Sequence, residues 1–182
     1  EQAGGEPTAG SGVGQSSDSR SMSARALKDS DAEAGFRCDR DPSKVEFLTK
    51  VALGYESRRY ARVFVLTDTN DTVVCGFFTL SMASIRPTEF PPDPSLPRHP
   101  LPVAMLGRLA RHDDRKGIGE TLMIDALRRV LALDREIGCL GVMLHAVNAG
   151  LVAYYQRFGF EALPRTSFPR AMFLAMASLT AP

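Results

Sequence analysis

Hydrophobic positions recur along this chain at helical spacing in three stretches. An apolar stripe follows the pair Asp41-Pro42, a helix cap with proline at the first helical position, and predicts a helix over residues 41–56. A longer apolar stripe predicts a helix over residues 117–137, which a glycine pair opens and Gly138 ends. A short helix is expected over residues 150–157.

Apolar runs that are continuous or alternate with polar positions predict strands between these helices. Asn70-Asp71 marks a hairpin turn, and seven prolines over residues 87–102 predict an irregular loop. The order of elements predicts an α/β (α+β) fold with one mixed central sheet flanked by helices. The strands are expected over residues 62–68, 72–85, 103–110, 140–147, 159–163 and 171–179.

The first 35 residues contain no aromatic residue and no isoleucine, and their opening is rich in glycine and serine. A stretch of this composition cannot offset its ordering entropy by burial. We therefore expect residues 1–35 to be a disordered tail or linker. A single folded domain is expected over residues 36–182.

The formal net charge of +1 gives no global basic field, so a nucleic-acid partner would need a local basic patch. Cys38, Cys75 and Cys139 have no zinc-ligand spacing and are expected to be reduced thiols, with no metal site. No apolar run is long enough to span a bilayer. These features predict a cytoplasmic protein without a membrane partner.

The stretch "RHDDRKGIGETLMIDALRRV" (111–130) joins a strand to a helix through a glycine turn. Such a turn exposes backbone N–H groups at the positive end of the helix dipole, which favours an anion. Taken alone, the stretch is more often a plain helix start. Asp113 and Asp114 precede the turn, and carboxylates beside a phosphate are electrostatically unfavourable.

The stretch "NAGLVAYYQRFGF" (148–160) places Tyr154 and Tyr155 on the short helix that ends near Gly159. Taken alone, the two tyrosines are more often core aromatics. In this order and at this separation, however, the two stretches together resemble the GNAT N-acetyltransferase superfamily. The resemblance identifies the first as the acetyl-CoA pyrophosphate loop and the second as the helix that carries the catalytic tyrosine.

Further segments are similar to the aminoacyl-tRNA-acetylating GNAT toxins of bacterial type II toxin–antitoxin systems. The likeness covers residues 36 to about 178 and includes the proline loop that leads into "PVAMLGRLA". The segments that carry it are "FRC" (36–38), "FFTLSMASI" (77–85), "LGRLA" (106–110), "GIGETLMIDALRRVL" (117–131) and "AYYQRFGFEALP" (153–164).

The resemblance implies that acetyl-CoA is the co-substrate and lies between two splayed parallel strands, 103–110 and 139–146. Tyr155 matches the tyrosine that protonates the departing CoA thiolate, a general-acid role. A backbone N–H near Leu109 would polarise the thioester carbonyl. The implied cofactor-binding residues are Leu109, Ala110, Arg111, Arg115, Lys116, Gly117, Ile118, Gly119, Glu120 and Asn148.

The implied acceptor is the α-amine of aminoacyl-tRNA, whose reference pKa of about 7.7–8.0 makes a strong base unnecessary. His145 is the best candidate base, although a packed core histidine is favoured over that role. Arg108 would either touch the tRNA 3′ end or close an ion pair. Five further arginines form either a phosphate-tracking patch or a solvated surface: Arg58, Arg59, Arg62, Arg86 and Arg98.

The loop before the glycines departs from the family. The toxins usually carry glutamine or arginine where Asp114 falls, and alignment on "LGRLA" gives a shorter loop here. If the glycines are aligned, Asp114 lies beside the pyrophosphate and would weaken cofactor binding, whereas the shorter-loop alignment leaves its carboxylate pointing to solvent. Two other functions stay open: acetylation of a small amine or protein N-terminus, and a non-catalytic binding module on the GNAT fold.

The resemblance also implies partners. A toxin of this family is neutralised by a small cognate antitoxin, which we expect to be a ribbon-helix-helix protein. The family is often dimeric, so the resemblance allows a homodimer, but the sequence leaves the oligomeric state open.

Overall fold

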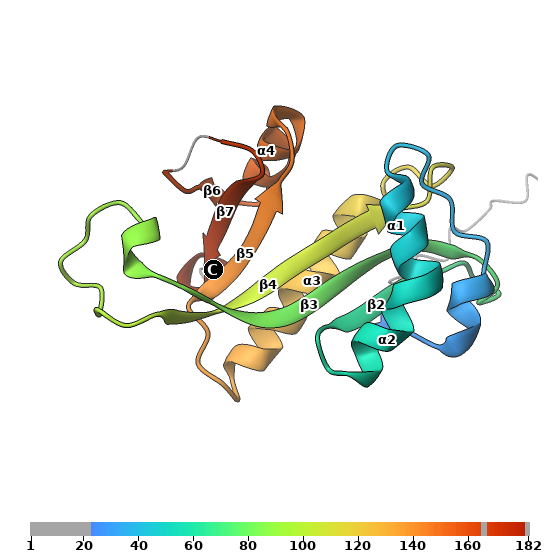
Figure 1. The fold of residues 1–182 in the computed structure, drawn as a ribbon, viewed down its shortest axis with the longest axis horizontal. Coiled ribbons are helices and arrows are strands. Elements are labelled where there is room, and N and C mark those ends of the chain that lie inside the picture. The colour runs from blue at the N-terminus through green and yellow to red at the C-terminus, as the bar shows by residue number, and fades with distance from the viewer. Residues whose placement is uncertain (1–22, 165–166, 181–182) are drawn as a thin grey trace, which may run out of the picture.

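The computed structural model describes residues 23–164 and 167–180 and contains a seven-stranded sheet in the order β1-β2-β3-β4-β5-β7-β6 (Figure 1). Neighbouring strands are antiparallel except for the parallel pair β4–β5. The mixed sheet confirms the predicted fold class. The strands are β1 (Arg25–Ala26), β2 (Arg62–Thr67), β3 (Val74–Ile85), β4 (Leu101–Arg111), β5 (Gly141–Ala146), β6 (Glu161–Ala162) and β7 (Arg170–Ala175).

The helix predicted after Asp41 forms, but its middle is π-helical. The Asp41 carboxylate accepts the Ser43 N–H at 3.2 Å and caps α1 (Pro42–Glu46), which continues through the π-helical segment η2 (Phe47–Val51) into α2 (Ala52–Ser57). The remaining helices are α3 (Ile118–Asp134), α4 (Ala149–Gln156) and α5 (Met176–Thr180), with short 3-10 turns η1 (Asp29–Glu33) and η3 (Pro87–Glu89).

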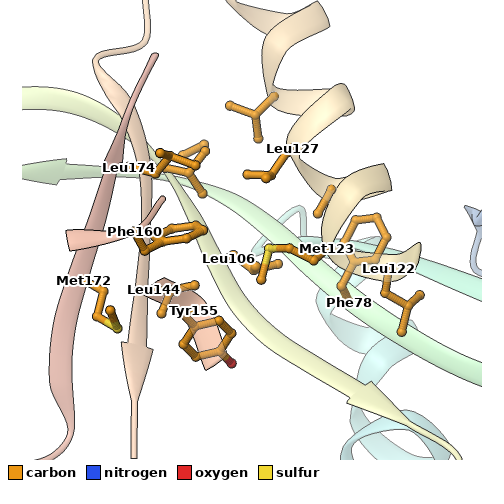
Figure 2. Close-up of a cluster of buried hydrophobic side chains, with 14 of the residues drawn as sticks. Phe78, Leu106, Leu122, Met123, Leu127, Leu144, Tyr155, Phe160, Met172 and Leu174 are labelled. Atoms are coloured by element: carbon orange, nitrogen blue, oxygen red, sulfur yellow. The ribbon is translucent and has the colours of Figure 1, made fainter. Parts of the chain in front are cut away.

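The sheet separates two hydrophobic layers (Figure 1). Helix α3 packs against β3 and β4 on one face, while α1 and α2 cover β2 and β3 on the other. Because side chains alternate along a strand, consecutive Phe77 and Phe78 are both fully buried but belong to opposite layers. The α3 layer, shown in Figure 2, also holds Leu122, Met123, Leu144, Phe160 and Leu174.

The last predicted strand is shorter than expected. It ends at Ala175, and residues 176–180 form α5 instead of continuing the sheet. The Met176 N–H donates to the Leu140 carbonyl at 2.9 Å, and Met176 is buried in the layer that contains α3. A short apolar run does not by itself distinguish a strand from a buried helix, which explains the error.

Residues 23–35 have a defined conformation, which differs from the disorder expected for them. Strand β1 pairs with β2, and Ala24 is buried against the core. The Arg25 guanidinium contacts both carboxylate oxygens of Asp31 at 2.8 Å and reaches Asp71 at 2.6 Å. These specific charge pairs hold a segment that has little apolar surface. The rest of the expected tail, residues 1–22, lies outside the described residues.

Candidate active site

The parallel strands β4 and β5 separate after a short pairing. Their register contains Ala104 opposite Val142 and Met105 opposite Met143, and beyond these positions the two strands diverge (Figure 1). On its other side β4 stays paired with β3 as far as Arg111. The edge of β4 that faces β5 therefore has backbone N–H and C=O groups without strand partners, which can bind an extended ligand.

A cleft of about 740 Å³ opens where the strands separate. Four parts of the chain line it: the end of β4, the start of α3, the end of β5 with α4, and the segment that leads into α1. Of the predicted cofactor residues it contains Leu109, Ala110, Arg111, Gly117, Gly119, Glu120 and Asn148, together with Tyr155, Arg108 and His145. Arg115, Lys116 and Ile118 are not among the lining residues, and Ile118 packs against the core.

The glycine turn at the start of α3 has the geometry of an anion site. Gly117 is the N-cap with φ of +83°, a left-handed conformation that glycine adopts readily. The first N–H groups of a helix have no intrahelical acceptor and lie at the positive end of its dipole. Two backbone N–H groups near the turn already have acceptors: Arg115 N–H donates to the His112 carbonyl at 3.0 Å, and Glu120 N–H to the Gly117 carbonyl at 3.2 Å.

The two acids before this turn bind protein and not the cleft. The Asp113 carboxylate accepts the Asp39 N–H at 2.6 Å, and the Asp113 N–H donates to the Arg37 carbonyl at 3.1 Å. The Asp114 carboxylate lies 3.9 Å from the Arg37 guanidinium, and both side chains are exposed. Asp114 does not line the cleft, which favours the shorter-loop alignment, in which its carboxylate points to solvent. The acids instead hold residues 37–39 against the loop.

Helix α4 presents two predicted residues to the cleft. The Asn148 side chain caps the helix by accepting the Leu151 N–H at 2.9 Å. Tyr155 is buried, its ring packs near Leu144 and Phe160, and its hydroxyl oxygen lies at the edge of the cluster (Figure 2). Burial raises the pKa of Tyr155 to about 12, so the phenol stays protonated at neutral pH and can donate a proton.

Arg108 reaches the cleft because β4 contains a bulge. Leu106 pairs with Leu80 and Arg108 with Thr79, so Gly107 is an extra residue. The Arg108 guanidinium carbon lies 4.0 Å from the centroid of the Phe47 ring in η2, a cation–π contact. No carboxylate of the described chain pairs with Arg108. Of the two roles predicted for Arg108, contact with the tRNA 3′ end and an ion pair within the chain, the ion pair does not form among the described residues.

His145 is exposed at the cleft and is the residue before Ala146, the last residue of strand β5. The favoured reading of this residue as a packed core histidine is therefore wrong.

The candidate arginine patch is also not one surface. Arg58, Arg59 and Arg62 lie at the connection of α2 to β2, where Arg62 pairs with Glu56 at 2.8 Å, while Arg86 and Arg98 belong to the β3–β4 connection at another part of the molecule (Figure 1).

Sequence reasoning missed several cleft residues. The segment before and within α1 contributes Cys38, Arg40, Asp41 and Lys44, and α4 contributes Tyr154 and Arg157. The "FRC" likeness and the Asp41 cap signal were the available clues to the first group. The cleft contains five cationic side chains (Arg40, Lys44, Arg108, Arg111 and Arg157) and two carboxylates (Asp41 and Glu120), although the whole chain carries only +1. This local excess favours an anionic ligand.

Burial also raises the pKa of the half-buried Cys38 thiol, which disfavours the reactive thiolate. Within residues 23–164 and 167–180, no group of three His, Cys, Asp or Glu side chains could hold a metal ion. No helix in these ranges is long and apolar enough to cross a membrane.

The separated parallel strands, the glycine turn and the buried tyrosine of α4 together define a GNAT-type cleft. No protein-family model matches the chain. The chain is 31% identical over 149 residues to a tRNA-acetylating toxin of Mycobacterium tuberculosis, covering 77% of this chain and 84% of the relative. A Sinorhizobium fredii protein named "Probable toxin TacT" is 30% identical over 145 residues, 73% of this chain and 79% of the relative. The chain belongs to this family of tRNA-acetylating GNAT toxins.

Solved structures of GNAT toxins confirm the fold. AtaT complexed with acetyl-methionyl-tRNAfMet has a TM-score of 0.77 at 23% identity, covering 86% of this chain and 96% of that chain. A tyrosine-to-phenylalanine variant of KacT has a TM-score of 0.77 at 22% identity, with coverage of 86% and 96%. AtaTR bound with acetyl-CoA has a TM-score of 0.72 at 24% identity, with coverage of 86% and 95%.

Proposed function

We propose that this protein is a toxin that transfers the acetyl group of acetyl-CoA to the α-amine of an aminoacyl-tRNA and so blocks translation. The relative named as a tRNA-acetylating toxin and the AtaT complex with acetyl-methionyl-tRNAfMet support this function. The observation that carries the proposal is one cleft that brings together the free edge of β4, the anion-binding turn of α3 and the buried Tyr155.

The residues present fit acetyl-CoA. The turn around Gly117 and Gly119 would hold the diphosphate, because free N–H groups and the helix dipole favour negative charge there. The free β4 edge at Leu109, Ala110 and Arg111 would hydrogen-bond the pantetheine arm, which is an extended chain with two amides. Asn148, at the opposite wall, would orient its reactive end.

Tyr155 is the proposed catalytic acid. As the amine nitrogen attacks the thioester carbonyl and the carbon–sulfur bond breaks, the sulfur needs a proton, and Tyr155 is protonated and at the cleft. A backbone N–H near Leu109 would stabilise the developing oxyanion. An α-amine with a pKa near 7.7–8.0 is partly free base at neutral pH, so it can attack without a strong base. The proton that the amine nitrogen loses after the attack can pass to solvent or to the exposed His145.

The acceptor end of the tRNA would approach from the side of α1 and η2. Arg108 lies over the Phe47 ring and has no carboxylate partner among the described residues, so its N–H groups are available to a phosphate of the 3′ end. Arg40 and Lys44 line the same cleft and add positive charge. We assign these three side chains to substrate binding.

The partners follow from the same function. AtaT has been solved bound to the C-terminus of its antitoxin AtaR, and KacTA has been solved with DNA. We propose that a cognate antitoxin, of the ribbon-helix-helix type, neutralises this protein, that the protein acts in the cytoplasm, and that it forms a homodimer.

The function is tested by incubating the protein with acetyl-CoA labelled in the acetyl group and with three acceptors in parallel. These are total aminoacylated tRNA, the same tRNA after deacylation, and a mixture of small amines and peptides. Label should appear on RNA only in the first reaction. Label on the small amines or peptides alone would instead favour a different acetyltransferase, and failure to bind acetyl-CoA would favour a non-catalytic module.

A further inference from the structure

We propose that Tyr154, the neighbour of the catalytic tyrosine, is a second positioning residue for acetyl-CoA and that its hydroxyl donates a hydrogen bond to the diphosphate held at the start of α3. The inference rests on the proposed use of acetyl-CoA. It does not depend on which amine accepts the acetyl group.

The Tyr154 ring is fixed by its neighbours on α4. Its centroid lies 5.4 Å from that of Tyr155 and 5.2 Å from that of Phe158, and both pairs are edge-on. The residue is half-buried and lines the cleft. The apolar part of the side chain is therefore held by packing, which leaves the hydroxyl at the cleft.

The hydroxyl points at the glycine turn on the opposite wall. The Tyr154 oxygen lies 3.0 Å from the position that a Cβ atom of residue 119 would occupy. Glycine at position 119 thus leaves room for the phenol to lie over the first turn of α3. Tyr154 connects the helix that carries Tyr155 with the turn proposed to hold the diphosphate.

The Tyr154 hydroxyl has no hydrogen-bond partner in the described part of the chain. Burial, followed by the charge of Glu120, raises the pKa of Tyr154, so the group is a donor at neutral pH. The free N–H groups of the α3 turn beside it are donors as well. Several donors that converge without an acceptor suit a ligand rich in anionic oxygens, and the diphosphate is the part of acetyl-CoA that provides them.

The local charges are consistent with this ligand. The Arg157 guanidinium carbon lies 6.0 Å from the Tyr154 centroid, and Arg111 is close enough to act on the same phenol. Glu120 is the opposing carboxylate, and it is exposed to solvent. The two cations offset it at the place where the diphosphate would lie.

The test compares Tyr154→Phe with the unaltered protein by titration calorimetry, using CoA and pantetheine as separate ligands. Pantetheine has the same thiol arm but no diphosphate. We expect Tyr154→Phe to weaken CoA binding about tenfold, as loss of one hydrogen bond to a charged group predicts, and to leave pantetheine binding unchanged. In kinetics, KM for acetyl-CoA should rise while kcat stays within about twofold.

Tyr60→Phe is the matched control, because Tyr60 is 59% exposed and does not line the cleft. It should bind both ligands as the unaltered protein does. Equal CoA affinity for Tyr154→Phe and the unaltered protein, or an equal loss for CoA and pantetheine, would overturn the inference. Absence of CoA binding by the unaltered protein would overturn it together with the proposed function, whereas CoA binding without tRNA acetylation would overturn only the proposed substrate.

Discussion

At the scale of single residues, Tyr154 and Tyr155 show how neighbouring side chains of one type acquire different chemistry. Tyr155 is buried in the α3 layer, whereas Tyr154 is half-buried and faces Gly119 across the cleft. Consecutive helical positions point about 100° apart, so one ring enters the core while the other covers the turn. The motif predicted Tyr155, but the contact between Tyr154 and Gly119 depends on how α4 packs and could not be deduced from spacing.

Substitution of Tyr155 by Phe should leave folding unchanged and lower kcat by about 100- to 10,000-fold, because only the proton donor is lost. The pKa of about 12 also fixes the pH dependence. Activity should rise through about pH 8 as the α-amine of the acceptor deprotonates. It should not fall again until the phenol ionises near pH 12. A rate profile from pH 6 to 10 that shows a descending limb would contradict the assignment of Tyr155 as the acid.

The loop acids provide a matched pair of substitutions. Asp113→Ala removes the acceptor for the Asp39 N–H, so we expect it to lower the stability by about 1 kcal/mol and to weaken acetyl-CoA binding through the shifted loop. Asp114→Ala removes an exposed carboxylate whose contacts with Arg37 and His112 are long, at 3.9 Å each, and should change neither quantity. Thermal denaturation and titration calorimetry measure both effects. Tighter acetyl-CoA binding by Asp114→Ala would mean that its carboxylate does face the diphosphate.

At the scale of elements, local patterns predicted most helices and strands but not their irregular parts. The caps at Asp41 and Asn148 and the glycine at position 117 carry local signals that depend on few neighbours. The π-helical segment η2 and the bulge at Gly107 carry none, although together they bring Phe47 under Arg108. Both depend on packing between segments that are distant in sequence. This explains why the sequence did not predict the side of the cleft that the segment before and within α1 forms.

The amino-acid composition of residues 1–35 did not predict strand β1. Arg25→Ala removes the contacts with Asp31 and Asp71 that hold β1 and should lower the melting temperature measurably at pH 7. Arg128→Ala, on the exposed face of α3, is the control and should have no effect. Hydrogen bonds from Lys28 and then Arg25 lower the pKa of Asp71 in the folded protein. The stabilisation is therefore complete above the unfolded pKa of about 3.9 and is lost as the pH falls below it.

Melting curves of Arg25→Ala and Arg128→Ala at pH 7 and pH 3 test whether the stabilisation by the Arg25 contacts depends on pH. The difference in melting temperature between Arg25→Ala and the unaltered protein should be smaller at pH 3 than at pH 7. An equal gap at both values of pH would show that the network does not titrate in this range. Removal of residues 1–21, which belong to the tail that the composition predicts to be disordered, should leave the melting temperature unchanged.

At the scale of the whole molecule, the separation of β4 from β5 decides where chemistry can occur. One sheet holds every described strand, and its one parallel pair opens into a cleft with five cationic side chains. The net charge of +1 predicted that any basic surface would be local, and the cleft shows such an excess. Seven of the ten residues that the family motifs predicted for the cofactor line this cleft, because turn, helix start and tyrosine are each encoded within a short stretch. That these residues bind acetyl-CoA stays a prediction.

The charge of the cleft predicts how Arg108 acts. Arg108→Gln should raise KM for aminoacyl-tRNA about tenfold, reduce the salt dependence of tRNA binding, and leave acetyl-CoA affinity unchanged. Arg108→Lys should restore little of the loss, because lysine keeps the charge but loses the planar stack on Phe47. Steady-state kinetics at two salt concentrations tests this. An unchanged KM for tRNA in both variants would remove Arg108 from the substrate site.

The central claim is that the acetyl group is transferred to the α-amine of an amino acid esterified to tRNA. The most direct measurement is mass spectrometry of the aminoacyl-adenosine that ribonuclease releases from charged tRNA after reaction with acetyl-CoA. We expect a mass increase of one acetyl group on the amino acid of at least one tRNA species, which with Tyr155→Phe forms about 100- to 10,000-fold more slowly. Aminoacyl-adenosine of unchanged mass for every tRNA species, in a reaction in which the protein binds acetyl-CoA, would contradict it.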